Sequence, residues 1–179
     1  MDSELVKKLE DAIWIAKSLF DRGKTSGSSA NMSFRHGNNI YITGSNTCFG
    51  NLEPTSFSLV DLEGNHIDGI KPSKEFPLHR EFYKKSDNIQ AVIHIHSFYS
   101  TLWSCLPHDN EKDCIPTYTP YLGMKLGPVG LVPYAKPGSK DLFKAFAEHI
   151  GEADGYLLSN HGRIVGGKDL FEAFYRIEE

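Results

Sequence analysis

The sequence has little of what would place it in a specialised class of protein. Only three of its 179 residues are cysteine, and none forms a C-x-x-C pair, so we predict neither a disulfide framework nor a zinc ribbon. Its apolar stretches are far shorter than the roughly 20 residues that cross a bilayer. Its acidic start also lacks the basic and then apolar pattern of a signal peptide. We therefore expect a cytoplasmic protein with no membrane partner.

Positive charge is also scarce. The chain has 19 Lys and Arg against 23 Asp and Glu, which gives a formal net charge of −4 at pH 7. Surfaces that bind nucleic acid normally carry excess positive charge that neutralises phosphates, so we expect no nucleic-acid partner. The shares of hydrophobic residues (40%) and charged residues (23%) are typical of a globular protein and exclude wholesale disorder. The length predicts one domain over residues 1–179.

The order of the predicted elements indicates an α/β fold. Apolar residues at helical spacing predict helices at residues 5–20, 77–83, 100–105, 140–150 and from 169 onward. Short alternating or wholly apolar runs predict strands at residues 32–34, 40–42, 58–62, 91–96, 131–134, 155–158 and 164–165. Turns rich in glycine and asparagine join the first two strands, and a similar turn follows the third, so two hairpins are expected. This arrangement favours a mixed, mainly antiparallel sheet covered by helices.

Histidine is the one unusually frequent residue, and two of the eight histidines lie on a predicted strand. Side chains alternate across a strand, so His94 and His96 face one site, while Ile93 and Ile95 face the core. Buried imidazoles need partners, and a divalent metal ion is one such partner. A pair of hydrogen-bonded histidines at the end of a strand would give the same pattern.

His161 and Glu75 are further candidates. His161 lies between a predicted strand and Gly162, on a tight, exposed turn of the kind that often carries functional residues. Three histidines leave an open position on zinc for substrate, and a nearby carboxylate can bind the metal or move protons. Glu75, near the start of a predicted helix, can be that carboxylate, or else a solvated or helix-capping residue. We expect His79, one turn later, to be a packing or surface histidine.

Three small polar segments end predicted elements, at residues 27–31, 43–45 and 73–74. Such segments present backbone N–H groups and hydroxyls to an anion such as phosphate. Each of them also fits a simple turn.

Four short motifs follow one another along the chain: SANMS at 29–33, KPSKE at 71–75, HIHS at 94–97 and NHG at 160–162. Together they resemble the class II aldolase and sugar-phosphate epimerase family. The corresponding family motifs are Ser-Gly-Asn-x-Ser, Lys-Pro-Ser-Ser-Glu, His-Thr-His-Ser and Asn-His-Gly. Ala30 stands in place of a glycine, and Lys74 in place of the second serine. The resemblance runs from the first predicted helix to the last.

The resemblance implies a three-layer αβα fold with a central mixed, mainly antiparallel sheet. It implies one Zn²⁺ per subunit on His94, His96 and His161, with Glu75 as acid/base and occasional fourth ligand. It also implies a homotetramer with active sites at subunit interfaces. The residues that it assigns to the phosphate of a substrate are Asn31, Thr43, Gly44, Ser73 and Lys74.

Further segments resemble one branch of the family, the 3-oxo-tetronate 4-phosphate decarboxylases. They are residues 48–52, 102–106, 119–121 and 132–138. Tyr121 matches the tyrosine assigned there as proton donor in a site completed by a neighbouring subunit, although by itself it fits a packing or surface aromatic. The implied activity is zinc-dependent conversion of this phosphorylated sugar acid to dihydroxyacetone phosphate and CO2 through a metal-stabilised enediolate.

Two alternatives remain at this point. The first is a class II aldolase or 4-epimerase that acts on another sugar phosphate. The second, more distant, is a non-catalytic interaction domain like the adducin head, which lacks the metal histidines. Family members continue beyond the last helix, so we expect their C-terminal extension to be absent here, where the sequence ends at Glu179.

Overall fold

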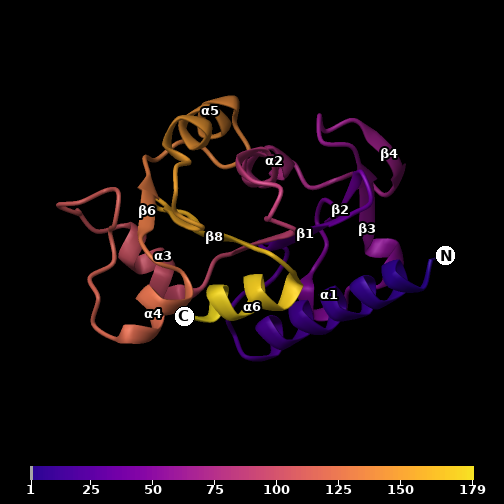
Figure 1. Cartoon of the computed structure of the whole chain (residues 1–179), viewed down its shortest axis with the longest axis horizontal. Helices are drawn as coiled ribbons and strands as arrows, with labels where there is room; N and C mark the ends of the chain where they lie inside the picture. Colours follow the sequence, from indigo (N-terminus) through magenta and orange to yellow (C-terminus); the bar gives the residue numbers. More distant parts are fainter. Residues whose placement is uncertain (1) are drawn as a thin grey trace.

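The computed structural model describes residues 2–179, and over that range the chain forms an eight-stranded sheet with helices on both faces (Figure 1). The strands are β1 (Asn31–His36), β2 (Asn39–Thr43), β3 (Phe57–Val60), β4 (His66–Gly69), β5 (Ala91–Ile95), β6 (Val129–Val132), β7 (Gly155–Leu158) and β8 (Gly162–Gly167). They lie in the order β4-β3-β2-β1-β5-β8-β7-β6. Strands β6 and β7 pair in parallel and the other neighbours are antiparallel, which confirms the predicted mixed sheet.

The helices form an outer layer on each face of the sheet. They are α1 (Ser3–Asp21), α2 (Phe76–Lys85), α3 (Phe98–Ser104), α4 (Pro120–Lys125), α5 (Lys140–His149) and α6 (Leu170–Glu178). In Figure 1, α1 and α6 lie on one side of the sheet, and α2 and α5 lie on the other. The fold is therefore the expected three-layer αβα arrangement. No helix within residues 2–179 has the length and apolar character needed to cross a membrane.

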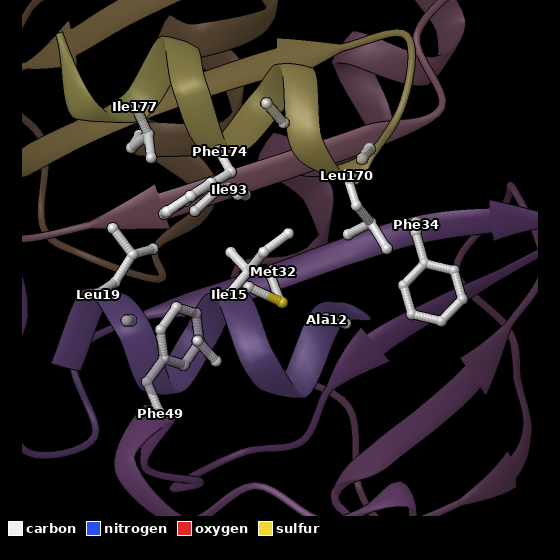
Figure 2. Packing of buried hydrophobic residues seen from close by; sticks show 14 of the residues in the cluster. Ala12, Ile15, Leu19, Met32, Phe34, Phe49, Ile93, Leu170, Phe174 and Ile177 are labelled. Carbon is white, nitrogen blue, oxygen red and sulfur yellow. The ribbon is translucent and has the colours of Figure 1, made fainter. Parts of the chain in front are cut away.

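Alternation along β5 separates two apolar cores. Ile93 and Ile95 are fully buried in the cluster beneath α1 and α6. Figure 2 shows Ile93 in this cluster, together with Ile15 of α1 and Phe174 of α6. Val92 belongs instead to the cluster beneath α2 and α5. Because side chains alternate, the next residue on that second face is His94, which confirms the predicted division of the strand.

Strand β6 and helix α4 illustrate how the structure differs from the sequence-based expectation. Strand β6 begins at Val129 and ends at Val132, two residues earlier than predicted, before Pro133. Proline has no N–H to donate to a sheet ladder, so it suits the residue after the strand. Helix α4 was not predicted, because none of its residues is buried and it has no apolar stripe to indicate helical spacing.

Candidate metal centre

His94 is held on the central strand β5 by a hydrogen bond that fixes its tautomer. Its side chain is fully buried. Its Nδ1 lies 2.9 Å from the backbone oxygen of Arg163 on β8. A carbonyl oxygen can only accept, so Nδ1 carries the hydrogen and donates it. The lone pair on Nε2 is then free to bind a cation, which is the usual way a protein prepares a histidine ligand.

The other two histidines meet His94 at the end of the sheet. His96 follows the last residue of β5, and His161 lies in the turn between β7 and β8. One ring nitrogen of each histidine lies within 4.8 Å of the others, as required of a group that could hold a metal ion. The Nε2 atoms of His94 and His96 are 3.0 Å apart. Two nitrogens bound to one tetrahedral zinc at 2.0–2.1 Å are separated by about 3.3 Å, so this geometry fits the ion.

The three rings are also in the protonation state that a metal requires. Burial lowers the pKa of His94 well below its ordinary value, and the neighbouring histidines lower it further. Burial, with a contribution from His161, lowers the pKa of His96 to about 4. The pKa of His161 is lowered mainly by burial, opposed by Glu75 and assisted by Lys74. All three imidazoles are therefore neutral at pH 7 and can offer lone pairs.

The backbone conformation of the NHG motif allows His161 to approach His94 and His96. Asn160 adopts the left-handed conformation (φ 54°), which asparagine tolerates better than most residues. At Gly162 a methyl group would lie 2.6 Å from the backbone oxygen of Ile95 and 2.7 Å from Cδ2 of His96, so glycine is required there. The sequence-based expectation that this turn is exposed was wrong for His161, whose side chain is buried.

Glu75 completes the cluster from the other side of the cavity. It occupies the N-cap position of α2, but its side chain is 5% exposed and makes no capping hydrogen bond, so the carboxylate is neither solvated nor used to cap the helix. Its Oε1 lies 3.5 Å from Nε2 of His161, and its Oε2 lies 3.5 Å from Nε2 of His94. Asn31 donates a hydrogen bond of 2.9 Å from Nδ2 to Oε2. The carboxylate can therefore reach a metal ion or a substrate beside the histidines.

A mainly polar cavity of about 250 Å³ opens over this cluster. The three polar segments predicted from the sequence all reach it. Its lining residues are Ser28, Ser29, Ala30, Asn31, Gly44, Ser45, Asn46, Ser73, Lys74, Glu75, His96, Pro137 and His161. Asn46 and Pro137 lie outside these three segments and are not among the predicted site residues. The one signal for Asn46 is its position in a polar turn, where it adopts a positive φ of 64°.

Two residues predicted to contact the substrate do not line this cavity. Thr43 is fully buried, its Oγ1 accepts a hydrogen bond from the backbone N–H of Met32, and it is not among the lining residues. Tyr121 lies on α4, is 59% exposed and is not among the lining residues either. Both assignments therefore stay predictions, and the predicted role of Tyr121 would require a neighbouring subunit.

A larger cavity of about 640 Å³ lies at the β6 edge of the sheet. Glu111, Asp113, Glu148 and Glu152 line it, together with Lys112. This excess of carboxylates repels anions such as phosphate, so this larger cavity does not suit the anion site that the sequence predicts.

Residues 10–179 match the family model described as Class II Aldolase and Adducin N-terminal domain. The chain belongs to this family. It is 39% identical over 171 residues to the 3-oxo-tetronate 4-phosphate decarboxylase of Escherichia coli (strain K12), covering 95% of this chain and 81% of the relative. It is 37% identical over 172 residues to the L-fuculose phosphate aldolase of Methanococcus maripaludis, covering 95% of this chain and 90% of the relative.

Solved structures of similar proteins support the same family membership. The chain is similar to the crystal structure of YgbL, a putative aldolase/epimerase/decarboxylase from Escherichia coli, with a TM-score of 0.93 and 36% identity. That match covers 99% of this chain and 86% of the other. An L-fuculose 1-phosphate aldolase matches with a TM-score of 0.82 and 27% identity, covering 99% of this chain and 82% of the other. Family membership and fold therefore agree with the resemblance carried by the four motifs.

Proposed function

We propose that this protein is a zinc-dependent carboxy-lyase that converts 3-oxo-tetronate 4-phosphate to dihydroxyacetone phosphate and CO2. The observation that carries the proposal is the convergence of three neutral histidines, two of them buried and one half-buried, and one buried carboxylate on a polar cavity. The choice of substrate is supported by the 39% identity to a decarboxylase of that name.

The reaction breaks the bond between C1 and C2 of the four-carbon acid. CO2 leaves, and the electron pair of the broken bond stays on C2, where the neighbouring C3 carbonyl delocalises it as an enediolate. A proton added at C2 then gives dihydroxyacetone phosphate. A divalent metal held by the three histidines would supply Lewis-acid stabilisation of the negative charge that develops on the substrate oxygens.

The chain's own residues would bind the substrate and handle the proton. Glu75 would carry the proton that reaches C2, because its carboxylate lies within the cluster and is nearly closed to solvent. Ser73 would donate a hydrogen bond to the phosphate from its hydroxyl at the rim of the cavity. Gly44 would form part of the wall beside the phosphate, because its N–H already donates to the backbone oxygen of Ser56 at 2.9 Å. Lys74 would add a positive charge there, and its aliphatic stem lies over Gly138, where a methyl group would come within 2.7 Å of Cδ.

The proposal extends to a homotetramer in which Tyr121 of a neighbouring subunit closes the site and acts as a second proton donor. A group of large apolar side chains on or beside α3 and α4 is exposed, as expected of a surface that another subunit covers. Its members are Phe98, Tyr99, Leu102, Tyr118, Tyr121 and Met124. Sedimentation measurements and the activity of Tyr121→Phe test this extension. A monomer with full activity contradicts it.

The test of the main proposal is turnover by the zinc-loaded protein. We expect 3-oxo-tetronate 4-phosphate to yield CO2 and dihydroxyacetone phosphate in equal amounts, followed by NADH oxidation in a coupled reductase assay. Glu75→Gln protein with zinc bound should be strongly impaired. If that variant works at the wild-type rate, Glu75 is not the acid/base.

A class II aldolase is the second candidate, supported by the 37% identity to an L-fuculose phosphate aldolase. An aldolase forms the same enediolate by cleaving a C–C bond to an aldehyde, so one set of residues can serve both reactions. A panel of aldehydes offered with dihydroxyacetone phosphate separates them. Condensation products from this panel, with no decarboxylation of 3-oxo-tetronate 4-phosphate, favour the aldolase. A purified protein that binds no metal and catalyses neither reaction is instead a non-catalytic binding domain.

A further inference from the structure

A row of buried polar side chains runs between β1 and α2, away from the cavity. Strand β1 contributes Asn31 and Ser33, two residues apart, and the α2 segment contributes Glu75, His79 and Tyr83, four residues apart. Two residues of a strand advance about 6.6 Å and four residues of a helix about 6 Å, so the two rows stay in step. Polar groups from a strand and a helix can therefore pair repeatedly along the layer.

Four consecutive short hydrogen bonds join the members of this row. The Tyr83 hydroxyl lies 2.7 Å from Oγ of Ser33, and that Oγ lies 2.8 Å from Nδ1 of His79. Nε2 of His79 lies 2.5 Å from Oδ1 of Asn31, whose Nδ2 donates to Oε2 of Glu75 at 2.9 Å. Ser33 and His79 are fully buried, and Tyr83 is 1% exposed. Water therefore offers these groups no alternative partners.

The hydrogen bonds can point in only one direction. The Asn31 oxygen can only accept, so Nε2 of His79 carries the hydrogen between them. Burial lowers the pKa of His79 to about 3, so the ring is neutral and its Nδ1 is an acceptor. Ser33 must then donate to Nδ1, and Tyr83 must donate to Ser33. Burial raises the pKa of Tyr83, so its hydroxyl keeps the required hydrogen.

We propose that His79 is a positioning residue that fixes the amide of Asn31, and through it the carboxylate of Glu75, with Ser33 and Tyr83 fixing the tautomer of His79. The inference rests on the proposed function of Glu75 as acid/base. The Asn31 amide occupies Oε2, which leaves Oε1, on the side of His161, as the oxygen that carries the transferred proton. With the opposite His79 tautomer, the Asn31 amide would turn and set its oxygen against the carboxylate.

The first test reads the tautomer directly and requires no turnover. In ¹⁵N NMR spectra of the full-length protein, we expect His79 to be protonated at Nε2 and unprotonated at Nδ1. Ser33→Ala removes the donor to Nδ1 and should produce a mixture of tautomers. Ser58→Ala is the matched control, because Ser58 is a fully buried strand serine whose Oγ has no hydrogen-bond partner among the described residues. Protonation of His79 at Nδ1 in the wild type overturns the inference.

The second test separates positioning from a merely structural role. His79→Leu should lower kcat about 10- to 100-fold, as loss of a supporting partner typically does, with little change in KM. His79→Gln should recover most of that loss, because its amide can still donate to Asn31. In the Glu75→Gln background, His79→Leu should cause no further loss.

An equal fold-loss from His79→Leu in both backgrounds overturns the inference, because His79 would then not act through Glu75. A wild-type protein with the expected tautomer but no decarboxylation contradicts the proposed function instead. The two failures are therefore distinguishable.

Discussion

Gly162→Ala should damage the metal centre by steric displacement alone. The new methyl group would lie 2.6 Å from the backbone oxygen of Ile95, 2.7 Å from Cδ2 of His96 and 3.3 Å from Cε1 of His94. Carbon atoms in contact are normally about 3.5–4.0 Å apart, so the His96 ring must move by about 0.8 Å or more. The variant keeps every proposed ligand and changes only their spacing.

The displacement sets the expected size of the effect. Overpacking of this kind should lower the free energy of unfolding of the metal-free protein by about 1–3 kcal/mol. Misplacement of a reacting group by about 1 Å can lower turnover about 100-fold, so kcat should fall by that order. Zinc affinity should fall as well, because the His94 and His96 nitrogens no longer converge.

Gly166→Ala on the same strand is the matched control. Its methyl group would lie 2.8 Å from Cδ1 of Phe82 and 3.2 Å from Cγ2 of Ile89, away from the histidines. Urea unfolding should show a comparable loss of stability for both variants, whereas competition with a chelating dye should show weaker zinc binding for Gly162→Ala alone. Wild-type zinc affinity in Gly162→Ala protein would refute the steric argument.

Three other perturbations test the electrostatics and chemistry of the site. The metal-free protein should lose stability as the pH falls from about 6.5 to 4, because the half-buried His96 has a lower pKa in the folded protein (about 4) than in the unfolded chain, which therefore binds more protons. Urea unfolding at several pH values measures this, and an equally steep loss in His96→Gln protein would contradict it. Lys74→Met should weaken inhibition by inorganic phosphate about 10-fold, since it removes a charged hydrogen-bond donor. Unchanged inhibition would show that Lys74 does not bind the phosphate. Removal of zinc by a chelator should lower the free energy of unfolding by about 2.7 kcal/mol, compared with protein in free zinc at 100 times the dissociation constant. A melting temperature that changes with neither chelator nor zinc would contradict a zinc site in the folded protein.

The sequence was informative where local geometry decides the outcome. Alternation on one strand is enough to place His94 and His96 together and to turn Ile93 toward the opposite core. The meeting of His161 with this pair depends on the pairing of β5 with β8, which no local pattern encodes. That part of the site was predicted only through the resemblance of four motifs to a known family.

Other features could not be predicted for related reasons. His79 was expected to be a packing or surface histidine, because its partners Asn31 and Ser33 lie on a strand far from it in sequence. The need for glycine at position 162 becomes visible only when the neighbouring strand brings Ile95 and His96 against it.

The central claim is that His94, His96 and His161 bind one metal ion. Anomalous diffraction at the zinc edge, from crystals of the zinc-loaded protein, tests it most directly. We predict one strong peak per subunit, within bonding distance of one nitrogen of each of these histidines. Absence of a peak there, or a peak only at the group formed by Asp2, Glu4 and His36 near the N-terminus, would contradict the account.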